Sequence, residues 1–150
     1  MIRALSRVLR HERGAVVIEA AFVAPILALL GLGAFQVSQA VARQHELQTG
    51  ADDAASMALA GWNDVTTQET ALKNVLMSTL SLATDKVTIT HKYRCGTTST
   101  YVAAKTSCAS TDIVTTYLQI VLTDTYTPTW AKFGFSDPLN LRVTRTVVLS

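Results

Sequence analysis

The chain has 150 residues and a formal net charge of +2, which is room for one modest domain and a membrane anchor. The first 14 residues contribute +3, from four arginines and one glutamate, so the remainder sums to −1. A folded part without a basic excess argues against nucleic-acid binding. Basic residues directly before an apolar segment predict that this end stays in the cytoplasm.

An apolar run of 21 residues follows, from Ala15 to Phe35. As a helix it would be about 31 Å long, which matches the hydrocarbon core of a bilayer. Its only charge is Glu19, five residues after Gly14. A carboxylate in a membrane helix costs about 2.5–3.5 kcal/mol at the bilayer centre, so we expect a partner for it. If the bond after Gly14 is cut, the new amine of Ala15 in one subunit can neutralise Glu19 of a neighbour.

Gly14, Ala15 as a new N-terminus and Glu19 at the fifth mature position resemble the processing motif of type IV prepilins. The longer segment 14–31, GAVVIEAAFVAPILALLG, is similar to the TadE-like pseudopilins of tight-adherence (Flp, type IVb) pilus systems. The resemblance extends to about Ala60 and is only architectural beyond that residue.

This resemblance implies a minor pilin or pseudopilin that a prepilin peptidase cleaves after Gly14. Glu19 would set the register between subunits. The partners would be other pilins and pseudopilins, through the N-terminal helix, and the inner-membrane assembly platform. The mature protein would span the bacterial inner membrane once, with its C-terminal domain in the periplasm, before it enters an extracellular pilus.

Other interpretations of the N-terminal segment stay open. Ala40-Val41-Ala42 has the small-x-small pattern of a signal-peptide cleavage site, although the apolar run is long for a signal peptide and contains Glu19. An uncleaved anchor would instead leave a periplasmic binding or adhesion domain that does not polymerise. Its contact surface would have two parts: the loop that joins the two cysteines, and the segment 130–135. A subunit of a type II secretion pseudopilus shares the processing motif.

The helical pattern continues from residue 36 to Gly61. Apolar residues recur every three or four positions, with Gln44 as a polar member: Val37, Val41, Leu47, Ala51, Ala54 and Ala58. This alanine-rich stripe predicts an amphipathic helix that packs closely on a domain. The opposite, solvated face is predicted to carry Arg43, Glu46, Asp52 and Asp53.

The remaining residues predict one short helix and about three strands. The helix would be capped by Thr66 or Thr67 and would end near Leu82, with an apolar face of Leu72, Val75, Leu76 and Leu80. Strict alternation then predicts antiparallel strands around 87–93, 118–122 and 139–143. The fold class is therefore α+β, with a long N-terminal helix on a small antiparallel sheet. The predicted parts are a leader (1–14), a transmembrane helix (15–35), an amphipathic extension (36–61) and an extracytoplasmic α+β domain (62–150).

Cys95 and Cys108 are the only cysteines, with twelve residues between them. Both fall in the part expected outside the cytoplasm, where disulfides form. A bridge would stabilise the fold by about 3 kcal/mol in the chain-entropy estimate. Two free buried thiols are the alternative, and a metal site would need further ligands besides the nearby His91.

The sequence gives no reason to expect an enzyme, a cofactor or a metal. The histidines at positions 11, 45 and 91 are scattered, and no nucleophile elbow, phosphate loop or dinucleotide motif is present. Asp52 and Asp53 are neighbours on a helix, so their side chains point about 100° apart and do not converge. The aromatic residues Trp130, Phe133 and Phe135 are expected to cover the sheet edge or the helix.

Overall fold

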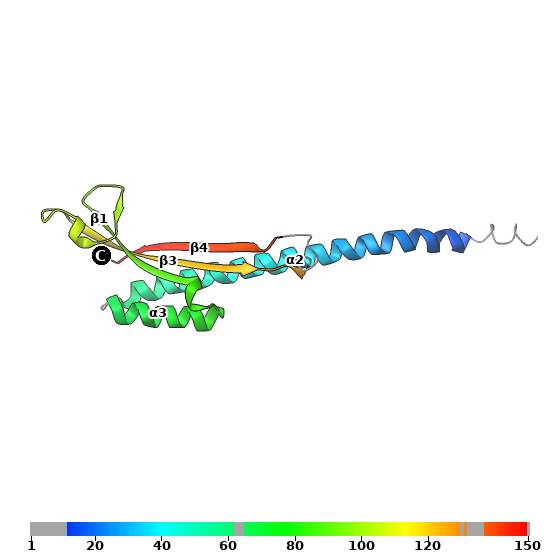
Figure 1. Ribbon diagram of the computed structural model, residues 1–150, viewed down its shortest axis with the longest axis horizontal. Helices are drawn as coiled ribbons and strands as arrows, with labels where there is room; N and C mark the ends of the chain where they lie inside the picture. Colours follow the sequence, from blue (N-terminus) through cyan, green and yellow to red (C-terminus); the bar gives the residue numbers. More distant parts are fainter. Residues whose placement is uncertain (1–11, 62–64, 130, 132–136, 150) are drawn as a thin grey trace, which may run out of the picture. The chain divides into compact units, whose positions relative to one another are not determined.

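The computed structural model describes residues 12–61, 65–129, 131 and 137–149 (Figure 1). The chain divides into two compact units, residues 1–39 and 40–150. The elements are the helices α2 (Glu12–Gly61) and α3 (Val65–Leu80), the short 3-10 turns η1 (Thr84–Lys86) and η2 (Lys105–Ser107), and the strands β1 (Val87–Cys95), β2 (Tyr101–Val102), β3 (Val114–Tyr126) and β4 (Leu139–Val148). A long helix, a short helix and an antiparallel sheet make the α+β fold that the sequence predicts.

The strands form one antiparallel sheet in the order β2-β1-β3-β4. The three predicted strands are present, and β2 adds a two-residue fourth strand that the pattern does not indicate. The register places Ile89 of β1 opposite Ile120 of β3, and Leu122 of β3 opposite Val143 of β4. Alternation therefore gives the sheet one apolar face.

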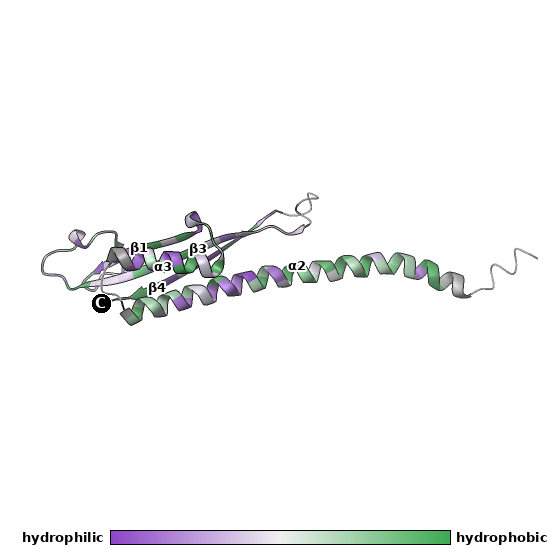
Figure 2. Ribbon diagram, turned by 90° about the horizontal axis from the view of Figure 1, so that it is seen from below, coloured by the Kyte–Doolittle hydropathy of each residue, from purple (hydrophilic) through white to green (hydrophobic). Residues whose placement is uncertain are grey.

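The core of the second unit lies between this apolar face and the two helices. Its buried side chains are Leu47, Ala51, Ala54 and Ala58 of α2, Leu72, Leu76 and Leu80 of α3, Leu82, and Val87, Ile89, Leu118, Ile120, Leu122 and Val143 of the sheet. Figure 2 shows the matching change along α2, from an almost uniformly hydrophobic first part to a mixed second part.

The predicted stripe of α2 is buried only from Leu47 onward. Val37 and Val41 are exposed, because they precede the first turn of α2 that faces the core. Val75, predicted on the apolar face of α3, is also largely exposed. The spacing in each case is helical, but Val75 borders the groove between α2 and α3 and stays partly open to solvent.

The two helices approach closely at Gly50. A Cβ atom at this position would lie 2.7 Å from Cδ1 of Leu80, which is closer than real contacts allow. A side chain at this position would force the Leu80 side chain to move, so glycine allows the present packing of Leu80 against α2.

The helix α3 ends two residues earlier than predicted, and the cause is its C-terminal cap. Ser81 adopts a left-handed conformation with φ of 53°. The backbone N–H of Leu82 then donates to the carbonyl of Met77 at 3.1 Å, which is the long bond of a Schellman motif. At the other end α3 begins at Val65, so Thr66 and Thr67 lie inside its first turn rather than at the cap. Their side chains are outside the described part.

Candidate functional site

The first part of α2 exposes its apolar side chains. Phe22 is 73 % exposed, and the other large apolar side chains from Val16 to Phe35 are exposed to a similar degree. Among the described residues, one helix is long and apolar enough to cross a membrane, and it contains this segment. Because water does not favour such a surface, the segment fits a single-span membrane anchor.

The structure places Gly14, Ala15 and Glu19 in the first turns of this helix. Glu19 lies about 7.5 Å along the helix axis from Gly14. Its side chain is exposed, and it forms no salt bridge with the side chains described from residue 16 onward. A partner for this carboxylate would therefore have to come from outside the described chain. The leader residues 1–11, including His11, lie outside the described residues.

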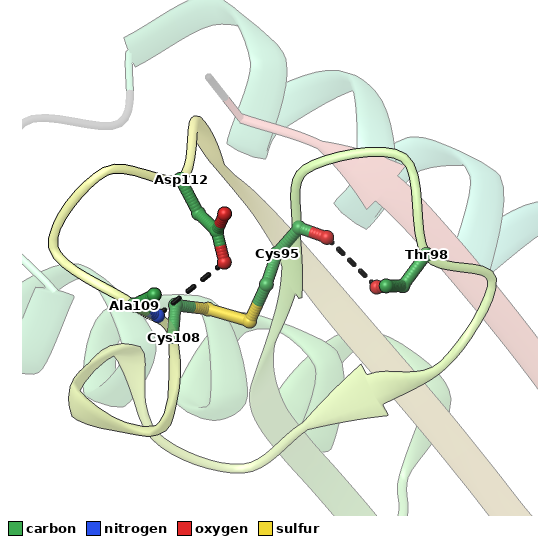
Figure 3. Close-up of a disulfide and its surroundings, with 5 residues drawn as sticks. All are labelled: Cys95, Thr98, Cys108, Ala109 and Asp112. Atoms are coloured by element: carbon green, nitrogen blue, oxygen red, sulfur yellow. Dashed lines mark hydrogen bonds between the residues drawn. A yellow bond between two sulfur atoms is a disulfide. The ribbon is translucent and has the colours of Figure 1, made fainter.

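Cys95 and Cys108 are joined by a disulfide, with 5.3 Å between their Cα atoms (Figure 3). Cys95 is the last residue of β1 and pairs with Val114 at the start of β3. The backbone N–H of Gly96, whose φ is 56°, donates to the carbonyl of Ile113 at 2.9 Å. Backbone pairing thus closes the loop 96–113 at its base, and the disulfide fixes a point inside it.

Hydrogen bonds between residues close in sequence hold the loop near the disulfide. The hydroxyl of Thr98 donates to the carbonyl of Cys95 at 2.8 Å. The carboxylate of Asp112 accepts from the backbone N–H of Ala109 at 3.3 Å. These contacts order the two ends of the loop while most of its residues stay exposed.

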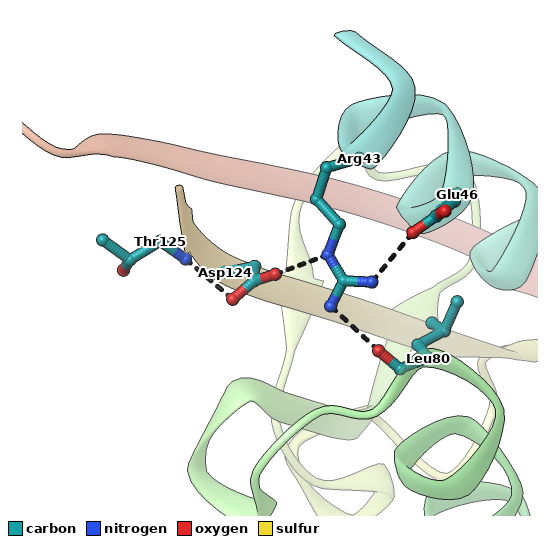
Figure 4. Close-up of polar contacts among 5 residues, drawn as sticks. All are labelled: Arg43, Glu46, Leu80, Asp124 and Thr125. Atoms are coloured by element: carbon teal, nitrogen blue, oxygen red, sulfur yellow. Dashed lines mark hydrogen bonds and ion pairs between the residues drawn. The ribbon is translucent and has the colours of Figure 1, made fainter. Parts of the chain in front are cut away.

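Arg43 connects three elements (Figure 4). Its Nε donates to the carboxylate of Asp124 on β3 at 2.7 Å, and its Nη2 donates to the carbonyl of Leu80 at the end of α3 at 2.8 Å. Its Nη1 donates to Glu46 on the same helix at 2.9 Å. Partial burial lowers the pKa of Arg43, but the hydrogen bonds to Asp124 and Glu46 outweigh this effect and raise its pKa above the ordinary value.

A second ion pair joins α2 to the edge of the sheet. The guanidinium of Arg145 on β4 donates to both carboxylate oxygens of Asp52, with Nη2 to Oδ2 at 3.2 Å. The hydrogen bond to Asp52 raises the pKa of Arg145. The expected solvated face of α2 is therefore wrong for Arg43, which is half-buried because its side chain reaches from the flank of the helix to the sheet. Asp52 is exposed as expected, and it also pairs with Arg145. Asp53 is exposed as expected.

The other candidates from the sequence do not come together. Within the described ranges, no group of three or more His, Cys, Asp or Glu side chains could hold a metal ion. His91 lies with its Nδ1 3.9 Å from Oε2 of Glu69, and His45 is exposed on α2. Trp130, Phe133 and Phe135 lie outside the described residues.

These features define a protein with one apolar helix that fits a membrane anchor and a small α+β unit. A family model described as TadE-like protein matches residues 14–56. No curated protein and no solved structure matches the chain. The match confirms the predicted resemblance to TadE-like proteins over this segment. The matched segment, residues 14–56 of 150, lies within the long helix α2.

Proposed function

We propose that this protein is a minor pilin or pseudopilin of a tight-adherence (Flp-type) pilus. The observation that carries the proposal is Glu19, a carboxylate without a salt bridge to any described side chain, in an exposed apolar helix. It lies five residues after Gly14 and inside the segment that matches the TadE-like family. A prepilin peptidase would cut between Gly14 and Ala15. The mature chain of 136 residues is large for a short major Flp subunit, which favours a minor role.

The register role of Glu19 rests on electrostatics in a low-dielectric helix bundle. The α-amine of Ala15 from a neighbouring subunit would neutralise the carboxylate, and a shifted register would leave both charges unpaired. Exposed apolar side chains on the same helix would supply the packing area. Other pilins and pseudopilins, and the inner-membrane assembly platform, would be the partners of this helix.

The proposed location is the bacterial inner membrane, with a single span, a cytoplasmic N-terminus and the α+β domain in the periplasm. The arginine-rich leader supports this orientation. The bridge between Cys95 and Cys108 is compatible with it, because the periplasm is oxidising. Assembly would then move the subunit into an extracellular pilus.

The first experiment is intact-mass measurement and N-terminal sequencing of the membrane-extracted protein. An N-terminus at Ala15 is expected in cells with the peptidase, and it should be lost in the variant Gly14→Val. Gly31→Val is the matched control, because a Cβ at Gly31 would meet no atom within 4 Å in this chain. Retention of Met1 in wild-type cells would favour the anchored domain that does not polymerise, and a start at Arg43 would mean a secreted protein.

A second experiment tests Glu19 itself. Glu19→Gln removes the charge and keeps the size, so we expect normal processing and membrane insertion but reduced incorporation into sheared pili. Asp53→Asn removes one charge from an exposed position of the same helix and should not affect incorporation. Equal incorporation of the two variants would contradict the register role.

A further inference from the structure

The face of the sheet that points away from the helices is basic and hydroxyl-rich. Because side chains alternate along a strand, this second face is made of the residues between the core positions. It carries the cations Lys92, Arg94 and Arg142 and the threonines 88, 90, 115, 123, 125, 144 and 146. The described strands place no aspartate or glutamate on it.

The cations of this face differ in their pairing with carboxylates from the two arginines that lie between helix and sheet. Arg43 and Arg145 are each paired with a carboxylate of the same chain. Within the described residues, no carboxylate forms a salt bridge with Lys92, Arg94 or Arg142. Among the described residues, no acidic group therefore competes with an anion from outside for these three cations.

One end of the face adds an exposed aromatic ring. The guanidinium of Arg94 lies 5.4 Å from the centre of the Tyr117 ring, and Tyr101 contacts Tyr117 edge to face at 5.1 Å. Tyr117 is only 7 % exposed, whereas Tyr101 is 49 % exposed. Lys92 lies opposite Tyr117 in the register, so two basic residues whose Cα atoms are about 7 Å apart lie beside an aromatic platform.

Arg142 extends the basic face toward the other end of the sheet. It lies six residues before Val148, the residue opposite Tyr117, which is about 20 Å along β4. Two grooves of the described residues lie elsewhere, between α2 and α3. A face with cations at its two ends suits a long chain molecule, because such a molecule can reach both ends at once, better than a small ligand in a concave site.

We propose that this face binds an acidic polysaccharide. Carboxylates of the sugar chain would pair with Lys92, Arg94 and Arg142, and a pyranose ring would stack on Tyr101. Threonine and amide side chains would exchange hydrogen bonds with sugar hydroxyls. The inference does not depend on processing or on pilus assembly, since an anchored domain would present the same face.

The test uses the full-length protein in non-ionic detergent and polygalacturonate as the probe. We expect saturable binding that weakens as salt rises. Loss of two ion pairs with the polysaccharide in Lys92→Gln/Arg94→Gln should weaken binding about tenfold. Lys73→Gln on α3 makes the same kind of charge change on the helix layer and should change binding less than about twofold. Circular dichroism would establish that each variant is folded.

Two further measurements separate a sugar site from simple charge attraction. Dextran, a neutral polysaccharide, should not bind, and Tyr101→Ala should weaken the binding of polygalacturonate but not that of polyphosphate. The proposal is overturned if polygalacturonate does not bind or if Lys73→Gln weakens binding as much as the double variant. Equal effects of Tyr101→Ala on both polyanions would also overturn it, since the face would then recognise charge alone.

Discussion

Replacing Arg43 with methionine tests how much one guanidinium contributes to holding α2, α3 and β3 together. Methionine keeps an apolar stem of similar length and removes all the donors. The side chains of Arg43 and Asp124 are 25 % and 24 % exposed, so their ion pair lies between the buried and the surface limits. Buried hydrogen bonds to charged groups contribute about 1.5–3 kcal/mol, and surface pairs about 0.2–1 kcal/mol.

From these limits we take about 1 kcal/mol each for the bonds to Asp124 and to the carbonyl of Leu80, and a few tenths for Glu46. Arg43→Met should therefore lower the free energy of unfolding by about 2 kcal/mol. For the unit of residues 40–150, the corresponding decrease in Tm is roughly 6–8 °C. Circular dichroism of the full-length protein in detergent would measure it.

A double-mutant cycle isolates the link between helix and sheet. Asp124→Asn combined with Arg43→Met should show a coupling free energy of about 1 kcal/mol, because the two side chains are in direct contact. Glu46→Gln, which removes only the exposed partner, is the control and should cost a few tenths of a kcal/mol. The reasoning is refuted if Arg43→Met is no more destabilising than Glu46→Gln.

The raised pKa of Arg43 fixes the sign of its pH dependence. A group whose pKa is higher in the folded state contributes its full stability below the unfolded pKa and loses it only as pH rises through the folded value. For arginine this window lies far above neutrality. The difference in Tm between wild type and Arg43→Met should therefore stay constant between about pH 6 and about pH 9, and a marked decrease at the alkaline end would contradict it.

Three further substitutions test local features. Gly50→Val should destabilise by about 1–3 kcal/mol through overpacking, and the additional change Leu80→Ala should recover part of this loss; strict additivity of the two changes would argue against the close contact. Ser81→Gly should raise stability by about 0.5–1 kcal/mol, because the relief of a left-handed serine exceeds the entropic cost of glycine, and a lower Tm would contradict this. Cys95→Ser/Cys108→Ser should cost about 3 kcal/mol, and a reductant should lower the Tm of wild type but not of the double variant; an unchanged wild-type Tm on reduction would count against the bridge.

Periodicity is sufficient to predict the elements, because their apolar residues repeat every two or every three to four positions. The strands around Ile89, Ile120 and Val143 have this alternation, and the structure pairs them in one sheet. The strand β2 could not be predicted, because an alternating pattern cannot be recognised in only two residues. The earlier end of α3 also escapes it, because a serine, not a glycine, adopts the left-handed conformation.

The pairing partners of charged residues could not be predicted from local sequence. Arg43 and Asp124 are 81 residues apart, and Asp52 and Arg145 are 93 apart. A helical wheel places Arg43 and Asp52 away from the apolar stripe but says nothing about the length of arginine side chains or the width of the sheet. By contrast, the candidate residues Gly14, Ala15 and Glu19 belong to a short local motif, so the sequence alone is enough to name them.

The strand β4 is ten residues long and forms an outer edge of the sheet, where backbone groups are open to pairing with another strand. Copies crowded in a membrane would be exposed to unwanted sheet extension at such an edge. Arg145 points from this strand toward the helices, and among the described residues Asp52 of the same chain neutralises it. An inward charge of this kind makes a flat continuation of the sheet unfavourable, so the same ion pair that attaches β4 to α2 also protects the domain against aggregation.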